Sequence, residues 1–454
     1  MGLKRNLSKV IGVNLLSIIM GVINGFVIPK FLGTGQYAVL MTYSLFVSFI
    51  GVFPLGFIDG MYINYGGKDE KDINKGIFKF EHRFLFLFQL LIAVIFLTVS
   101  IVLQNRVIFY FSLTILPFTL IGFFKLFYQA VGNFDKFTFL SILNTLVMFV
   151  FNMILILFGT KEAETFMIAN VISYYITFIY IEYIYYLTYK KVNIRKDYTL
   201  IKNNFKIGAP ILVGNLSLLL FYSIDRWIVR ILLDLESFAY YSFAISMMTL
   251  INVLISAITT TFYPYLSKNR EDSMLRKLKN YFLIIGSCAS ASYFVFSMIV
   301  IYFIPKYKPS LEIIAILLAS LPVMIIIKVL YVNLYQAQKR ERLYVWTIVV
   351  MLVVSVVMNI ISVILQKSNT SIALATTVSF YIWYYYSSRH FKSLSISSRE
   401  ILYLLLFNVL YVLLVGVNNN IWLGALLFMI GLSFLIYVFF KDDIRSLFID
   451  ALKA

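Results

Sequence analysis

Basic residues collect at alternate ends of successive apolar segments along the chain, and this alternation constrains the fold more than any other feature. Each segment is near the ~20 residues that a helix needs to cross a bilayer, where only helices or closed barrels satisfy their own backbone. The segments are 10–28, 37–58, 82–103, 107–129, 137–158, 165–188, 207–232, 237–262, 281–304, 311–334, 343–365, 371–388, 400–417 and 421–440.

The connections on one side, together with both termini, hold 30 of the 39 Lys and Arg residues, and the opposite connections hold only 6. Basic residues stay on the cytoplasmic side of a membrane. The sequence therefore predicts an all-α polytopic membrane protein of about 14 transmembrane helices with both termini in the cytoplasm.

The composition excludes several other classes of protein. With 61% hydrophobic residues and mean hydropathy +0.88 the chain is a membrane protein, and its net charge of +18 belongs to short loops that orient helices. We therefore expect no nucleic-acid partner. Cys288 is the only cysteine, and His82 and His390 fall in two distant predicted loops, so we expect no metal site and no bound cofactor.

The two halves of the chain resemble each other weakly at an offset of a little over two hundred residues. Tyr128-Gln129-Ala130 recurs as Tyr335-Gln336-Ala337, and Pro117 recurs as Pro322. Six helices in each half would make parallel repeats with a substrate path between them. The predicted domains are a six-helix lobe at 1–190, a cytoplasmic linker at 191–206, a second six-helix lobe at 207–392, and two extra helices with a tail at 393–454.

No predicted connection is longer than roughly 25 residues, which is too short for a folded soluble domain. The chain also lacks a G-x-x-x-x-G-K-[ST] phosphate loop. These absences argue against a membrane enzyme with a catalytic loop and against a nucleotide-driven pump. Secondary transport remains, and no residue is assigned to catalysis.

The segment 207–232 carries the most polar side chains within a predicted helix. Asn215, Tyr222, Arg226 and Arg230 are spaced by seven, four and four residues, which places them on one face of a continuous helix. Charge within a membrane costs about 2.5–3.5 kcal/mol on insertion scales. Arg226 would line a cavity and bind a phosphate or carboxylate; alternatively it snorkels to the interface or pairs with the adjacent carboxylate. For Arg230, a surface pair with Asp234 is favoured.

The first segment carries a stripe of polar and small residues at Asn14, Ser17, Gly21 and Asn24. It either lines a cavity or packs closely against a neighbouring helix. Lys328 lies about two turns from the end of 311–334, within snorkelling reach of the interface. The predicted substrate-binding residues are Asn14, Asn24, Asn215, Tyr222, Asp225, Arg226, Arg230 and Lys328.

Three stretches carry a resemblance to a known family. They are residues 28–33 (IPKFLG), residues 65–69 (YGGKD) and residues 223–226 (SIDR). Together with the helix count, they resemble oligosaccharide-lipid flippases of the Wzx type, within the multidrug/oligosaccharidyl-lipid/polysaccharide exporter superfamily.

This resemblance implies that an undecaprenyl-pyrophosphate-linked repeat unit crosses from the inner to the outer leaflet of a bacterial plasma membrane by alternating access. The polymer would be capsule, O-antigen, exopolysaccharide or a teichoic-type glycan. The implied partners are the lipid-linked oligosaccharide, membrane lipids, and a polysaccharide polymerase with its assembly proteins. Coupling to a proton or sodium gradient stays open.

Two alternatives within the superfamily remain. A cation-coupled multidrug exporter typically embeds an acidic residue in its first helix, and segment 10–28 has none. The family of peptidoglycan lipid II flippases is expected to have a more basic cavity, with arginines in the first helices. In this chain the first helices contain only Lys30.

Overall fold

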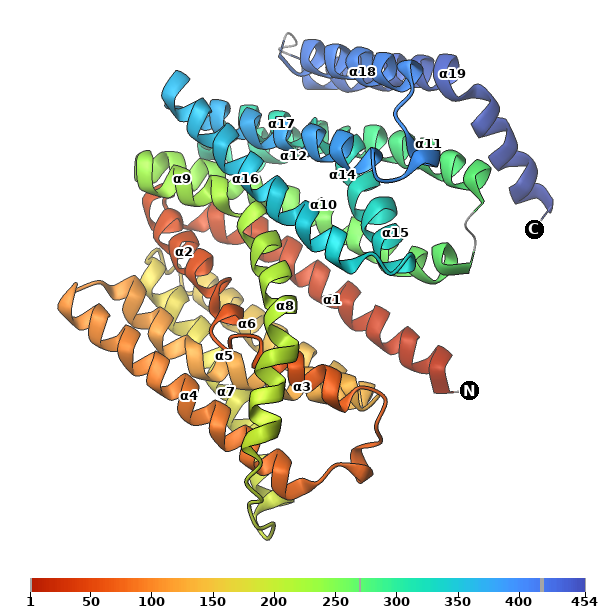
Figure 1. The fold of residues 1–454 in the computed structure, drawn as a ribbon. Helices are drawn as coiled ribbons and strands as arrows, with labels where there is room; N and C mark the ends of the chain where they lie inside the picture. Colours follow the sequence, from red (N-terminus) through yellow and green to blue (C-terminus); the bar gives the residue numbers. More distant parts are fainter. Residues whose placement is uncertain (1, 269–270, 417–419, 454) are drawn as a thin grey trace. The chain divides into compact units, whose positions relative to one another are not determined.

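The computed structural model describes residues 2–268, 271–416 and 420–453, and all of the regular secondary structure in this part of the chain is helical (Figure 1). Short 3₁₀ or π segments connect or continue several helices: η1 (Ile50–Val52), η2 (Glu70–Asp72), η3 (Pro305–Tyr307), η4 (Ile326–Tyr331) and η5 (Lys392–Leu394). The helices are α1 (Gly2–Phe31), α2 (Thr34–Val47), α3 (Phe57–Tyr65), α4 (Lys75–Val102), α5 (Arg106–Ala130), α6 (Phe134–Leu157), α7 (Ala163–Tyr189), α8 (Tyr198–Phe221), α9 (Ile224–Leu232), α10 (Leu235–Lys268), α11 (Asp272–Ser290), α12 (Ser292–Phe303), α13 (Ser310–Leu318), α14 (Leu321–Ile325), α15 (Val332–Ala337), α16 (Glu341–Leu365), α17 (Asn369–Ser388), α18 (Ser398–Gly416) and α19 (Ile421–Lys453).

The all-α membrane architecture predicted from the sequence is confirmed, but the count of fourteen spans is not. Every predicted segment falls on one helix or on a run of consecutive helices. Among the described residues, eleven helices are long and apolar enough to cross a membrane, or twelve if one bent pair counts as a single span. Three predicted segments account for the difference. Segment 311–334 is the bent pair, segment 10–28 is represented by a shorter apolar helix at Ile19–Phe31, and α17, which covers segment 371–388, is not among the candidate spans.

The chain divides into two compact units, which we call unit 1 (Met1–Leu219) and unit 2 (Leu220–Ala454). The division falls near the C-terminal end of α8, whereas the sequence predicted a linker at 191–206, of which residues 198–206 are helical. The two units are defined by contacts within the structure, whereas the predicted domains were defined by an internal sequence repeat, so the units do not test the predicted boundaries. The predicted domain boundaries therefore stay a prediction.

In unit 1, helix α5 is the central element and packs against α2, α3, α4, α6 and α7. Its buried face is aromatic, and Phe123 and Phe127 contact Phe78 of α4 and Tyr65 of α3. Asparagines cap three of these helices: Asn74 accepts hydrogen bonds from the first turn of α4, Asn105 from α5 and Asn133 from α6. Capping asparagines of this kind each stabilise a helix by about 1 kcal/mol.

Glycines allow α3 and α8 to approach each other within unit 1. A Cβ on Gly60 would lie 1.9 Å from the carbonyl oxygen of Asn204, and a Cβ on Gly208 would lie 1.8 Å from that of Gly56. Gly56 also has φ +82°, which favours glycine. Both helices present small or polar residues four apart at the crossing, a pattern that permits close backbone contact in membranes.

The crossing carries a buried polar network. Glu81 of α4 is buried and accepts hydrogen bonds from the hydroxyl of Tyr65 and from Nδ2 of Asn204, the latter at 2.6 Å. Asn204 in turn accepts from Nδ2 of Asn64 at 2.5 Å. Buried polar groups need such partners, so the network ties α3, α4 and α8 to one another.

In unit 2, α13 packs against α10 and α17, and α17 packs against α16. Helix α18 pairs with α19 (Figure 1). The segment that the sequence predicted as one helix at 311–334 is bent by 50° between α13 and the helical run from Leu321 to Ala337. Pro322 stands at the start of that run and contributes to the bend, because proline cannot donate a backbone hydrogen bond.

Each unit contains a lysine that donates hydrogen bonds to backbone carbonyls at the end of, or after, a long helix. In unit 1, Nζ of Lys79 on α4 donates to the carbonyls of Tyr189 and Val192 after α7, both at 2.9 Å. In unit 2, Nζ of Lys279 on α11 donates to the carbonyl of Leu394 at 2.9 Å, after α17. In both units a lysine therefore fastens the loop that follows a long helix.

Candidate functional site

The helix predicted at 207–232 is interrupted at Tyr222 and Ser223, between α8 and α9. The expectation that four side chains share one face assumed a continuous helix. With the interruption, Asn215 lines a cavity of unit 1, whereas Tyr222 and Arg226 line a cavity of unit 2. The predicted residues of this segment thus divide between two sites.

The unit-2 cavity has a volume of about 160 Å³ and brings together residues that are far apart in the sequence. Its polar lining comes from five segments: the α8–α9 break, α9, α10, the bent helix and α17. The polar residues are Tyr222, Asp225, Arg226, Thr249, Asn252, Lys328 and Thr376. Four of these (Tyr222, Asp225, Arg226 and Lys328) were predicted from the sequence.

Lys328 is held inside this cavity. Its Nζ donates to Oδ1 of Asn252 at 2.8 Å and lies 4.6 Å from the ring centroid of Tyr222. The residue lies in the π-helical segment η4, and local π geometry is frequent at functional sites. The sequence left snorkelling open for Lys328, but its ammonium points to partners within unit 2.

Asp225 has partners on three elements. Its Oδ1 accepts from the backbone N–H of Arg226 at 2.7 Å, and its Oδ2 accepts from the hydroxyls of Tyr241 at 2.8 Å and Thr376 at 3.4 Å. The side chain is buried. Asp225 therefore fastens α9 to α10 and α17, and its carboxyl group lies next to Arg226.

The remaining predicted residues lie elsewhere. The guanidinium of Arg230 lies 5.9 Å from the ring of Phe238, and Asp234 accepts from the backbone and hydroxyl of Ser237. Asn24 is half-buried in α1, and its Oδ1 is buried without a hydrogen bond. Asn14 belongs to α1, but its side chain lies outside the described part of the structure.

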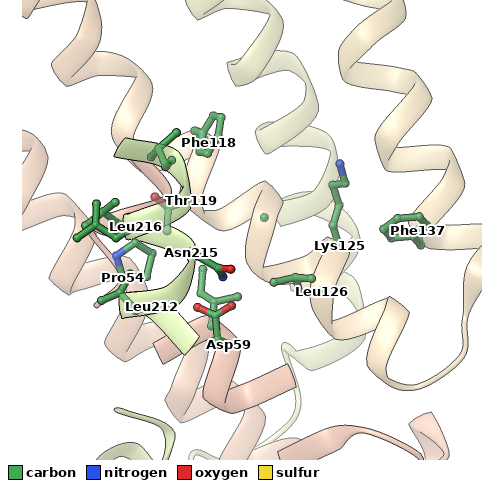
Figure 2. A pocket seen from close by; sticks show the side chains of 15 residues that line it. Pro54, Asp59, Phe118, Thr119, Lys125, Leu126, Phe137, Leu212, Asn215 and Leu216 are labelled. Carbon is green, nitrogen blue, oxygen red and sulfur yellow. The ribbon is translucent and has the colours of Figure 1, made fainter. Parts of the chain in front are cut away.

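The unit-1 cavity is larger, about 460 Å³, which is within the usual range for small-molecule sites. Its walls are mostly apolar and come from the α2–α3 connection, α3, α5, α6 and α8. The polar lining residues are Asp59, Thr119, Lys125 and Asn215 (Figure 2).

The charges of the unit-1 cavity are separated. Figure 2 shows the carboxylate of Asp59 near Asn215, while the ammonium of Lys125 is directed away from Asp59. Lys125 lies 5.8 Å over the ring of Phe137. Within the described residues, neither Asp59 nor Lys125 forms an ion pair. The cavity thus offers a carboxylate and an ammonium to an occupant.

Neither Asp59 nor Lys125 was among the predicted site residues, although Lys125 lies within α5. His82, predicted in a loop, lies in α4 with its Nε2 2.7 Å from Oε1 of Glu182. Asp59 was overlooked because segment 37–58 was taken to end before it. An acidic residue one position past an apolar segment was the available signal.

Comparison with known proteins agrees with this architecture. Residues 82–270, less than half of the chain, match the family model described as polysaccharide biosynthesis protein. No curated protein matches the chain in sequence.

Two kinds of transporter share the fold. The lipid II flippase MurJ in an inward closed conformation superposes with a TM-score of 0.67 at 14% identity, covering 96% of this chain and 99% of that one. An inward-facing multidrug resistance MATE transporter of the MOP superfamily gives 0.58 at 13% identity, covering 84% and 98%. The MATE multidrug transporter DinF-BH gives 0.54 at 13% identity, covering 87% and 97%. The solved structures are those of a flippase and of multidrug transporters, and the chain is a multi-pass membrane protein that shares their fold and matches the polysaccharide biosynthesis family model over residues 82–270.

Proposed function

We propose that this protein is a flippase for a lipid-linked oligosaccharide, carried on polyprenyl pyrophosphate, for the assembly of a surface polysaccharide. The family match concerns polysaccharide biosynthesis, and a structure with the same fold is a lipid II flippase. The proposal places the protein in a bacterial plasma membrane with both termini in the cytoplasm. A polysaccharide polymerase and its assembly proteins would be the partners that use the product.

One observation carries the proposal: Arg226 and Lys328 line a single small cavity in unit 2. A pyrophosphate carries several negative charges, and hydrogen bonds from a guanidinium or an ammonium to phosphate are the strong, charge-assisted kind. The volume of about 160 Å³ suits the headgroup rather than a whole oligosaccharide. The sugars and the polyprenyl chain would lie outside this cavity.

The test is export in a deletion strain that carries plasmid-borne variants. Each charge-assisted hydrogen bond to the substrate is worth about 1.5–3 kcal/mol, so Arg226→Ala and Lys328→Met should each lower export roughly 10- to 100-fold. Arg226→Lys keeps the charge without the planar fork and should retain partial export. Arg230→Ala is the matched control, because Arg230 is on the same helix but does not line the cavity.

The measurement is surface glycan divided by the amount of membrane-inserted protein. Full export per molecule in Arg226→Ala and Lys328→Met would contradict the site. A loss of protein abundance with normal export per molecule would instead assign Arg226 to the neutralisation of Asp225, since removing one partner strands a buried charge.

A second candidate function, cation-coupled export of small molecules, rests on the unit-1 cavity. Its apolar walls and the carboxylate of Asp59 would suit a proton, a sodium ion or an organic cation. A deletion strain with normal surface glycan and increased sensitivity to cationic dyes would favour this function. Under the flippase proposal, the carboxylate of Asp59 would bind the coupling proton or sodium ion. Asp59→Asn should then lower glycan export and leave dye sensitivity unchanged.

A further inference from the structure

Unit 2 also contains a cavity of about 290 Å³ that is predominantly basic and shares no lining residue with the proposed flippase site. We call it the basic cavity. It is framed by the first turns of α11, by η5, by the start of α18 and by α19 near Phe440, where the backbone leaves helical geometry. Its charged lining residues are Arg276, Lys279, Arg399 and Glu400.

The four charges divide into an internal pair and two open cations. Lys279 and Glu400 are both buried, and Nζ of Lys279 lies 2.9 Å from the carboxylate. Glu400 also accepts a hydrogen bond from the hydroxyl of Tyr384 at 2.5 Å, so both of its carboxylate oxygens have partners within unit 2. Arg276 and Arg399 are exposed and form no ion pair with any residue that the structure describes.

The surroundings of the two arginines favour an anion. Arg276 is held by a hydrogen bond from its Nε to the carbonyl of Ser393 at 2.9 Å, which leaves its terminal nitrogens available. Ser395 and Ser397 add further polar groups to the lining. Guanidinium and hydroxyl donors in this combination suit a phosphate group.

The apolar surfaces next to the cavity indicate where such a phosphate comes from. Beyond the start of α18, its large side chains Ile401, Leu402 and Leu405 are half or more exposed within the described structure, and on α19 so are Phe434 and Tyr437. In a polytopic membrane protein such faces contact acyl chains. A phosphate seated in the basic cavity would then continue into hydrocarbon along α18 and α19.

We propose that the basic cavity binds the phosphate group of an anionic phospholipid whose acyl chains lie along α18 and α19. This site is separate from the proposed flippase site, and its occupant is a resident membrane lipid rather than the transported molecule. Basic pockets between transmembrane helices on the cytoplasmic side commonly bind anionic headgroups. The predicted topology places the connection between α17 and α18 on that side.

The experiment uses the purified full-length protein in a mild non-ionic detergent. Melting temperature is followed while dioleoyl phosphatidylglycerol, dioleoyl phosphatidylcholine or inorganic phosphate is added. Phosphatidylglycerol should stabilise the protein at the lowest concentration. In Arg276→Gln/Arg399→Gln its half-saturating concentration should rise roughly 10- to 30-fold, at about 1 kcal/mol for each basic residue near a headgroup. Arg276→Lys/Arg399→Lys keeps both charges without the guanidinium donors, and its half-saturating concentration should lie between those of the wild type and the glutamine variant.

The matched control is Lys190→Gln/Lys191→Gln, which removes two exposed charges from a loop of unit 1. An equal loss in this control, or unchanged phosphatidylglycerol binding in the double arginine variant, would overturn the proposal. If inorganic phosphate stabilised the protein at the same concentration as phosphatidylglycerol, the bound phosphate would not need to belong to a lipid. The site would then be assigned to free phosphate. If the double variant fails to fold, Arg399→Gln alone should weaken phosphatidylglycerol binding by about half as much on a logarithmic scale.

Discussion

Gly60→Ala is the sharpest test of how unit 1 is assembled. The added Cβ would lie 1.9 Å from the carbonyl oxygen of Asn204, and its other nearest atoms also belong to the backbone of Asn204. Ordinary van der Waals contact begins near 3.4 Å. The two helices would therefore have to separate by about 1.5 Å, since a backbone cannot rotate aside as a side chain can.

Two costs add up in this variant. Overpacking of a close interface costs about 1–3 kcal/mol. Separation also moves Asn204 away from Glu81, to which it donates at 2.6 Å, and leaving a buried polar group unsatisfied costs about 1–3 kcal/mol more. The expected destabilisation is about 2–6 kcal/mol. For a unit of this size, such a change lowers the melting temperature by roughly 5–20 °C.

The assay is thermal unfolding of the detergent-solubilised protein, monitored by fluorescence-detected size exclusion. Gly25→Ala is the matched control: Gly25 is within helix α1, and a Cβ there would meet nothing within 4 Å. Alanine should be neutral or stabilising at that position, by up to about 1 kcal/mol. A melting temperature of Gly60→Ala within about 2 °C of the wild type would refute the close crossing of α3 and α8.

Two further predictions concern topology and pH. With Cys288 replaced by Ser, a cysteine at Lys191 should be shielded from an impermeant thiol reagent in intact cells and one at Lys367 should react; equal or reversed labelling would contradict the predicted orientation. Burial alone would raise the pKa of Glu70, but hydrogen bonds from Lys136 and Asn133 lower it below its ordinary value. Because the folded pKa is depressed, the stabilisation is present above the unfolded pKa and is lost as pH falls through the folded one. Glu70→Gln should therefore melt below the wild type at pH 7 and together with it near pH 3, and a difference in melting temperature that persists at low pH would contradict this interpretation.

Much of the fold was predictable because its signals are local. A membrane segment must be apolar over about twenty residues and must satisfy its own backbone, so each predicted segment coincides with helix in the structure. The breaks were not predictable from hydropathy. Tyr222 and Ser223 continue an apolar pattern but interrupt the helix, and the bend near Pro322 depends on its neighbours as much as on the proline itself.

The candidate site was predictable in part, through the cost of charge in a membrane. That rule singled out Arg226 and Lys328, which line one cavity although a hundred residues separate them in sequence. It could not find Asn252 or Thr376, because neutral polar residues are common in membrane helices and only their contacts distinguish them. It also missed Lys125, whose position near a predicted helix end made it resemble an ordinary loop lysine.

The sequence by itself determined the class of the protein: the apolar segments and the distribution of Lys and Arg require a helical membrane protein, since these properties depend on each segment and its own surroundings. Only the tertiary structure decided which charges share a cavity, which are consumed in pairs such as Lys279 with Glu400, and which remain open, as Arg276 does. Those outcomes depend on helix breaks and on backbone approaches at glycines such as Gly60, where distances of a few ångströms between distant residues set the result.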